Sequence, residues 1–196
     1  MPPHSETELV VKILESFHDF TLTLKPLAKE LIEKHPVDAV LGLLRGHWFQ
    51  SVVGYFVNHR PSNPYAYIND EYKVQDLLYC LLLTVLDDLQ YEDPTGKTKG
   101  ALASTRLDLV SKRQGLIIEA KFASSKHFAK DIESEISEDI VKYGKLPDFN
   151  TIIFFIYCRD YAFPNSKEFE LGFTDRHEIA GHRSNTYCII KPRKEV

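Results

Sequence analysis

The run TIIFFIYC at positions 151–158 constrains the fold of this chain more than any other stretch. It has the length of a strand and contains no charged side chain, which is typical of a central strand covered on both faces. A sheet with such a strand needs a layer of helices on each side. The sequence therefore predicts an α/β fold.

The periodicity of apolar residues predicts helices in the first part of the chain and mostly strands afterwards. The first 60 residues are predicted helical, with a capping box from Ser5 to Glu8. Pro26 and Pro36 stand at helix starts, and three glycines argue against one unbroken helix over 37–58. The next elements are a loop at 60–69, a strong helix at 69–91 capped by Asp70, and a turn-rich loop at 93–100.

Strands are then predicted at 105–110, 116–122, 151–158 and 186–191, with an amphipathic helix at 131–143. This order predicts a central mixed β-sheet flanked by helices, preceded by an α-helical N-terminal region. We expect residues 1–62 to pack as that helical region on a core formed by residues 63–196.

Charge is distributed unevenly along the chain. The formal net charge of −4 argues against a generally basic nucleic-acid binder. Residues 97–130 nevertheless carry a net charge of +6, and residues 67–93 a net charge of −6. A basic strip on an acidic protein fits phosphate contact at one face, although a solvated charged surface gives the same pattern.

Cysteine usage and hydropathy bear on the compartment. Cys80, Cys158 and Cys188 are widely spaced beside apolar residues, which predicts buried free thiols in a reducing cytoplasm. The longest apolar run, LLYCLLLTVL, is far shorter than the ~20 residues of a membrane-spanning helix. The first residues lack the basic patch and apolar core of a secretory signal. We therefore expect a cytoplasmic protein without membrane contact.

Two successive strands carry acidic residues where a buried strand would avoid them. The stretch RLDLVSKRQGLIIEAKF consists of two apolar runs joined by a basic turn. Side chains two residues apart share a face of a strand, so Glu119 and Lys121 point the same way. If the strands are neighbours, Asp108 meets Glu119 at one edge of the sheet. Two carboxylates this close repel unless a cation lies between them, and Mg²⁺ or Mn²⁺ takes such oxygen ligands.

The spacing of Asp108, Glu119 and Lys121 resembles the D…ExK core of the PD-(D/E)XK nucleases. A more specific resemblance is to the DpnII/MboI-type restriction-endonuclease domain, over about residues 40–170. It is carried, in order, by NDEYKVQDLLYCLL, STRLDLV, IIEAKF, ISEDIVKY and TIIFFIYC. The chain departs from the superfamily pattern at Leu107, where a proline often stands, and it is shorter than typical site-specific members.

The resemblance implies a restriction-endonuclease-like fold and a role for each side chain of the motif. Asp108 and Glu119 would bind Mg²⁺, or alternatively Mn²⁺, with the carbonyl of Ala120 as a further ligand. Lys121 would position the attacking water or stabilise charge on a phosphate. Glu71 would support the metal directly or through water, although it also suits the first turn of a helix.

Further candidates surround this motif. Gln75, one helical turn after Glu71, suits hydrogen bonding to a metal ligand better than ligation. Asp139 would face the site, or else lie with Glu135 on the solvated face of its helix. Arg106 would pair near Asp108 or touch phosphate. The full set of phosphate-contact candidates is Arg106, Lys112, Arg113 and Lys126.

The resemblance implies a Mg²⁺-dependent DNA endonuclease in prokaryotic defence against foreign DNA. Restriction-type nucleases cut both strands by pairing subunits with twofold symmetry, which favours a homodimer or a higher homo-oligomer. Two alternatives stay open. One is a catalytically silent binding or regulatory subunit that joins a defence-system partner protein, and the other is a nuclease that acts on RNA. Intact Asp108, Glu119 and Lys121 argue against the silent subunit.

Overall fold

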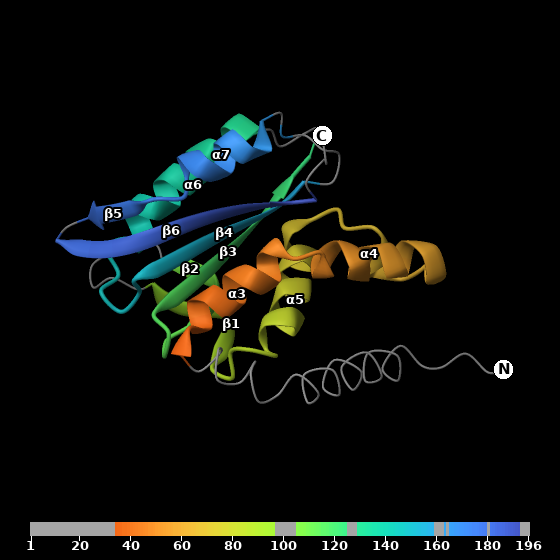
Figure 1. Cartoon of the computed structure of the whole chain (residues 1–196), viewed down its shortest axis with the longest axis horizontal. Helices are drawn as coiled ribbons and strands as arrows, with labels where there is room; N and C mark the ends of the chain where they lie inside the picture. The colour runs from red at the N-terminus through yellow and green to blue at the C-terminus, as the bar shows by residue number, and fades with distance from the viewer. Residues whose placement is uncertain are drawn as a thin grey trace.

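A mixed β-sheet of six strands forms the centre of the molecule (Figure 1). The computed structural model describes residues 34–96, 105–124, 129–158, 163, 165–179 and 181–192. Across the sheet, the strands in these residues follow the order β1-β2-β3-β4-β6-β5. They are β1 (Leu89–Gly96), β2 (Thr105–Ser111), β3 (Leu116–Ala123), β4 (Thr151–Cys158), β5 (Arg176–Ile179) and β6 (His182–Lys191).

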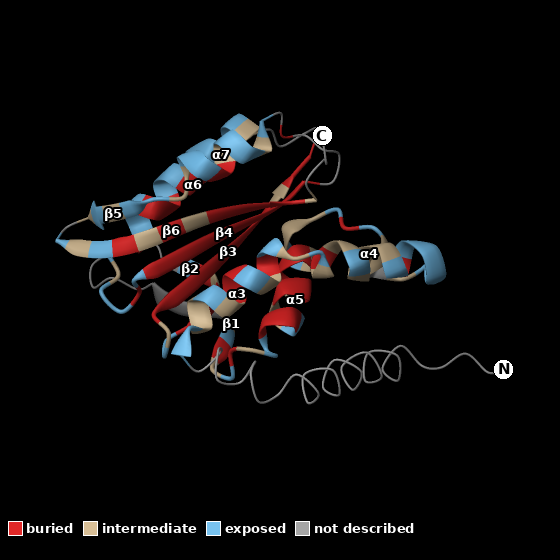
Figure 2. Ribbon diagram, in the orientation of Figure 1, coloured by how far each residue is buried: buried red, intermediate tan, exposed pale blue. Residues whose placement is uncertain are grey.

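Strand β4 lies inside the sheet, as its apolar sequence predicts. It runs parallel to β3 on one side and to β6 on the other, and all eight of its residues are buried (Figure 2). Strands β1, β2 and β3 form an antiparallel meander, and β5 pairs antiparallel with β6. Helix α6 (Ala129–Tyr143) connects the parallel strands β3 and β4. The predicted mixed sheet is thereby confirmed.

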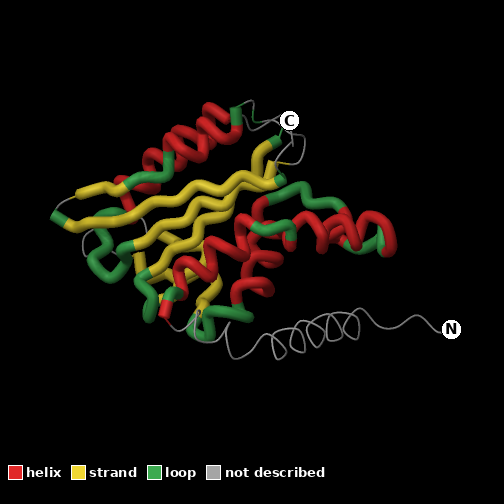
Figure 3. Tube along the Cα trace, in the orientation of Figure 1, coloured by secondary structure: helices red, strands yellow, loops and turns green. Residues whose placement is uncertain are grey.

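Helices cover both faces of this sheet (Figure 3). Helices α3 (Pro36–Arg45), α4 (Trp48–His59) and α5 (Glu71–Leu82) contribute to one apolar cluster. Helices α6 and α7 (Ser166–Gly172) contribute to a second cluster on the opposite face. Alternate residues of β3 enter the two clusters, with Ile118 and Ala120 on the α5 side and Ile117 and Ala123 on the α6 side.

The helical region before the sheet is interrupted, as its glycines suggest. Pro36 begins α3, and the chain leaves the helix at Gly46, whose amide bonds to the carbonyls of Gly42 and Leu43. Apolar residues of α3, Val40 among them, pack in the same cluster as the sheet. The predictions for residues 1–33 lie outside the described residues, and the boundary at residue 62 stays a prediction.

The helix predicted over 69–91 is shorter than expected, which is a correction. Asp70 caps it as predicted, because its side chain accepts a hydrogen bond from the Lys73 amide at 2.9 Å. The helix ends at Leu82, and the chain then turns into β1, which takes up part of the predicted 93–100 loop. Asp88 bonds to the neighbouring Ser111 hydroxyl at 2.6 Å, a long-range contact that helical periodicity does not encode. The 60–69 loop is confirmed, with one 3₁₀ turn, η1 (Pro64–Ala66).

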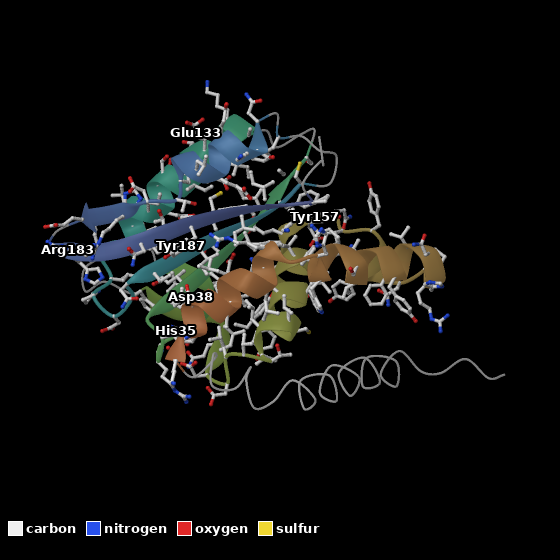
Figure 4. The ribbon with its side chains drawn as sticks, in the orientation of Figure 1. His35, Asp38, Glu133, Tyr157, Arg183 and Tyr187 are labelled. Atoms are coloured by element: carbon white, nitrogen blue, oxygen red, sulfur yellow. The ribbon has the colours of Figure 1, made fainter. Side chains whose placement is uncertain are left out.

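Helix α7 and strand β5 were not predicted, and β6 begins earlier than the predicted residue 186. Strand β5 pairs only with the first residues of β6, from His182 to Asn185. Arg183 lies at the outer end of this β5–β6 hairpin (Figure 4). Beyond that, side chains take the place of a neighbouring strand: the Ile190 amide donates to Glu170 at 2.7 Å and the Cys188 amide to Thr174 at 3.1 Å. The edge of β6 is thereby satisfied without a full partner strand.

The three thiols are free, but only two of them are buried. Cys158 and Cys188 lie in the core as predicted. Cys80 is exposed, because it falls on the face of α5 that points away from the sheet. Among the helices that the structure describes, none combines the length and the apolar character needed to cross a bilayer.

Candidate active site

The backbone pairing of strands β2 and β3 ends at Asp108, and we call this end of the hairpin, with Asp108 and Glu119, the parted end. Their paired register runs from Ser111 opposite Leu116 to Leu109 opposite Ile118. At the next position the Asp108 side chain, rather than the backbone, accepts the hydrogen bond of the Ala120 amide, at 2.9 Å. The predicted approach of Asp108 to β3 is therefore present in the structure.

Regular alternation would place Asp108 on one face of β2 with Arg106 and Val110, but it stops at this point. Leu107 packs in the α6-side cluster and Leu109 in the α5-side cluster, although residues two apart share a face of a regular strand. Asp108 consequently does not sit in an unbroken row with Val110. The irregularity frees its carboxylate to reach into the gap between the strands.

Glu119 and Lys121 lie together on the face of β3 that meets α6. The Lys121 ammonium is 3.1 Å from Glu119 Oε1, and both side chains are buried. The same ammonium is 3.0 Å from Asp139 Oδ2 and 3.7 Å from Glu135 Oε2, both on α6. The structure thus brings Asp139 into the cluster, and Glu135 approaches its rim.

Helix α5 delivers Glu71 and Gln75 to the site from the opposite face of the sheet. Burial raises the pKa of Glu71 to about 7, and Glu119 adds to the shift while Lys121 opposes it. Gln75 is buried, and its carbonyl oxygen accepts from the Tyr91 hydroxyl at 3.2 Å. That contact leaves the Gln75 amide nitrogen to donate toward Asp108.

The two central carboxylates are short of positive charge. Burial raises the pKa of Asp108, and Glu71 adds to that shift, while the Ala120 amide, Lys121 and Gln75 oppose it. Burial also raises the pKa of Glu119; the charge of Asp108 raises it further, and Lys121 lowers it. One Glu119 oxygen, Oε2, is buried without a hydrogen-bond partner. Carboxyl groups placed in this way are typical of functional sites.

This donor set fits a hard divalent cation. Mg²⁺ binds through one or two carboxylates and keeps several water molecules. Asp108 and Glu119 offer such a pair, and the unpartnered Glu119 oxygen leaves a coordination position to fill. In the described part of the chain, no three His, Cys, Asp or Glu side chains are grouped as a complete ligand set. Water and substrate oxygens would therefore have to complete the coordination.

Tyr143 is a member of this cluster that sequence reasoning missed. It lies in the last turn of α6 and is fully buried. Burial raises the pKa of its hydroxyl, and the Glu119 and Asp139 carboxylates raise it further. A tyrosine in an otherwise aliphatic helix stripe was the available signal, because a buried phenol needs a polar neighbour.

Of the described candidates for phosphate contact, Arg106 lies beside this cluster, whereas Lys112 and Arg113 lie away from it. Arg106 is exposed near the parted end of β2, and Lys126 is not among the described residues. Lys112 and Arg113 are exposed at the hairpin turn, four residues and about 13 Å of strand from the level of Glu119. Arg113 is paired there with Asp87, with nitrogen–oxygen distances of 2.7 and 3.0 Å.

The sheet order and the acidic cluster at the parted strands together define a restriction-endonuclease-like domain. The family model of the DpnII-MboI restriction endonucleases matches residues 47–189, which is most of the chain. The protein therefore belongs to the DpnII-MboI restriction endonuclease family, and membership implies a nuclease that binds DNA. Comparisons with curated proteins and with solved structures gave no match.

Proposed function

We propose that the protein is a Mg²⁺-dependent endonuclease that hydrolyses phosphodiester bonds in DNA, with Mn²⁺ able to replace Mg²⁺. The observation that carries the proposal is the meeting of Asp108 and Glu119 where β2 and β3 part, with Lys121 on the same face. Family membership supplies the substrate class.

Asp108 and Glu119 would hold the ion, with the Ala120 carbonyl as a further oxygen and Glu71 in support. When bound, Mg²⁺ supplies Lewis acidity and offsets the charge that develops on the phosphate. A cation here also removes the repulsion between carboxylates whose pKa values are raised.

The surrounding side chains would position the reactants. Lys121 would orient the attacking water and favour negative charge on the phosphate. Gln75, fixed by Tyr91, would orient Asp108 through its amide. Backbone phosphates of DNA would be contacted by Arg106, Lys112, Arg113 and Lys126.

We propose further that this activity serves prokaryotic defence in the cytoplasm, in a homodimer or higher homo-oligomer. Cutting both strands of a duplex with one site per chain favours twofold pairing of subunits. A defence-system partner protein would be an additional regulator.

The test is incubation of the purified protein with linear duplex, circular duplex, single-stranded DNA and RNA, each with Mg²⁺, Mn²⁺ or chelator. We expect duplex DNA cleavage that requires the divalent ion and disappears in Lys121→Ala. Lys145→Ala, a change at an exposed lysine, is the matched control. Cleavage of RNA but not of DNA would change the proposed substrate from DNA to RNA. No cleavage of any substrate would favour a silent subunit, and full activity of Lys121→Ala would remove the proposed site.

A further inference from the structure

Asp139 occupies a place where helix stability does not call for an acid. It lies on the buried stripe of α6 between Ile136 and Ile140, close to the C-terminal end of the helix. The helix dipole favours cations rather than anions near that end. Burying a carboxylate is also unfavourable unless a partner compensates it. The position of Asp139 therefore has to be explained by what it contacts.

Its contacts are two lysines. One oxygen, Oδ2, is 3.0 Å from the Lys121 ammonium, and the other, Oδ1, is 3.6 Å from Lys142. Glu135 also approaches Lys121, but at 3.7 Å and with 40% of its side chain exposed, against 11% for Asp139. Asp139 is thus the closer and less solvated of the two α6 carboxylates, and the stronger anchor for the ammonium.

Glu119 cannot serve Lys121 and a divalent ion equally. Its Oε1 contacts the ammonium, whereas its Oε2 has no partner. If Glu119 coordinates a divalent ion, that ion repels the ammonium of Lys121. The ammonium then needs a carboxylate that does not bind the ion, and Asp139 already contacts it from the α6 side.

We propose that Asp139 is a positioning residue that holds the Lys121 ammonium on the α6 side and leaves Glu119 to the metal. The inference rests on the proposed metal-dependent nuclease activity. Helix α6 can fix this geometry because Ile132, Ile136 and Ile140 anchor it in the core. The position of the Lys121 ammonium relative to the phosphate would then be fixed by helix α6 as well as by strand β3.

The first test is Asp139→Asn, which keeps the shape of the side chain and removes its charge. We expect kcat to fall about 100-fold with little change in KM, because a misplaced catalytic group affects the transition state more than binding. Asp139→Glu should restore part of kcat, since it returns the charge one methylene further out. Glu138→Gln makes the same charge change at an exposed position of the same helix and should cleave like the wild type.

Wild-type cleavage distinguishes a failure of the proposed nuclease activity from a failure of the positioning role of Asp139. Absence of cleavage by the wild type would count against the proposed function, whereas cleavage by Asp139→Asn at the wild-type rate would overturn the positioning role alone. A loss that Asp139→Glu does not reduce would also overturn it, because it would indicate a packing defect.

A second measurement needs no variant and no activity. In a crystal structure of the wild type with Mn²⁺ bound, the Lys121 ammonium should remain within hydrogen-bond distance of Asp139 and leave Glu119. An ammonium that stays on Glu119, or that leaves Asp139, would overturn the inference even if Asp139→Asn failed to fold.

Discussion

The two ends of the β2–β3 hairpin place their acidic side chains in opposite environments. At the turn, partial burial acts to raise the pKa of Asp88, but hydrogen bonds from the Ser111 hydroxyl and the Arg113 amide hold it below its usual range. At the parted end, Glu119 is buried and Asp108 is partly buried, both with too few donors, and the pKa values of both are raised.

The difference separates an end that stabilises the fold from the end that carries the proposed active site. Acids at the turn are matched by donors within the chain, so they contribute to folding without any ligand. Acids at the parted end have the Lys121 ammonium and the donors of Ala120 and Gln75 beside them, yet their pKa values stay raised. A divalent cation bound there, as proposed, would compensate the remaining charge. One short hairpin thus carries both a stabilising cluster at its turn and the proposed active site at its other end.

The largest effect should come from removing one central carboxylate. Asp108→Asn keeps an oxygen for the Ala120 amide but loses the charge that would bind the metal. We expect DNA cleavage to fall about 1,000-fold, in the range found when a preorganised electrostatic group is removed. We also expect the metal-free variant to be more stable than the wild type above pH 7, because carboxylate repulsion is relieved.

Cleavage assays and urea unfolding measure these two effects on the same samples. Glu133→Gln, at an exposed residue of α6 (Figure 4), should change neither quantity. A metal-free Asp108→Asn protein that is less stable than the wild type would contradict the view that this end is strained by charge.

The response to pH and metal should be the next largest effect. The pKa of Glu71 is about 7 in the folded protein, against 4.5 ordinarily, so the folded state binds more protons between these values. The unfolding free energy of the metal-free protein should therefore decrease as pH rises from about 4.5 through 7. Mg²⁺ at about 100 times its Kd should add about 2.7 kcal/mol where the carboxylates are ionised.

Urea titrations from acid to neutral pH, with Mg²⁺ or with chelator, measure both the pH dependence of the unfolding free energy and its increase by Mg²⁺. A stability that rises with pH in chelator, or that Mg²⁺ leaves unchanged at neutral pH, would contradict the charge deficit at the parted end.

A substitution at the turn end of the hairpin should lower the stability of the protein and leave its cleavage activity unchanged. Gly115 has a φ of +58°, and a Cβ placed there would lie 3.1 Å from the Asp148 carbonyl oxygen. Gly115→Ala should therefore lower the unfolding free energy by about 1–2 kcal/mol, the strain of a left-handed non-glycine residue. Gly172→Ala is the control, because nothing lies within 4 Å of its added Cβ.

Thermal unfolding and cleavage rates below the melting transition report the outcome. Gly115→Ala should cleave DNA at the wild-type rate while folded. A large loss of cleavage without loss of stability would show that the turn belongs to the functional end after all.

Sequence periodicity predicted the elements whose pattern is long or fully apolar. The hairpin, β4 and α6 follow from such patterns and are confirmed. Strand β1 was missed because DPTG resembles a loop and because its partner β2 lies later in the chain. Helix α7 and strand β5 are too short for a periodic signal, and their place is set by the edge of β6.

The approach of Asp108 to Glu119 follows from hairpin pairing, which is a local rule, whereas the break in the alternation of β2 at Asp108 does not. The contacts of Tyr143 and of Gln75 with the site depend on how helices dock on the two faces of the sheet. The same applies to the pairing of Arg113 with Asp87, because the two residues are distant in sequence. Patterns within one element carry no information on such packing, whereas family motifs indicated Asp139.

The smallest expected effects concern this exposed ion pair, whose Arg113 and Asp87 side chains are 62% and 75% exposed. Asp87→Asn should leave the unfolding free energy nearly unchanged, because solvent screens such a pair. It also releases the Arg113 guanidinium, which should tighten DNA binding about twofold at low salt if Arg113 contacts phosphate. Arg113→Ala should then lower the slope of log affinity against log salt by about one. An unchanged affinity and slope in both variants would assign this turn to folding alone and leave DNA contact to Arg106 and the parted end.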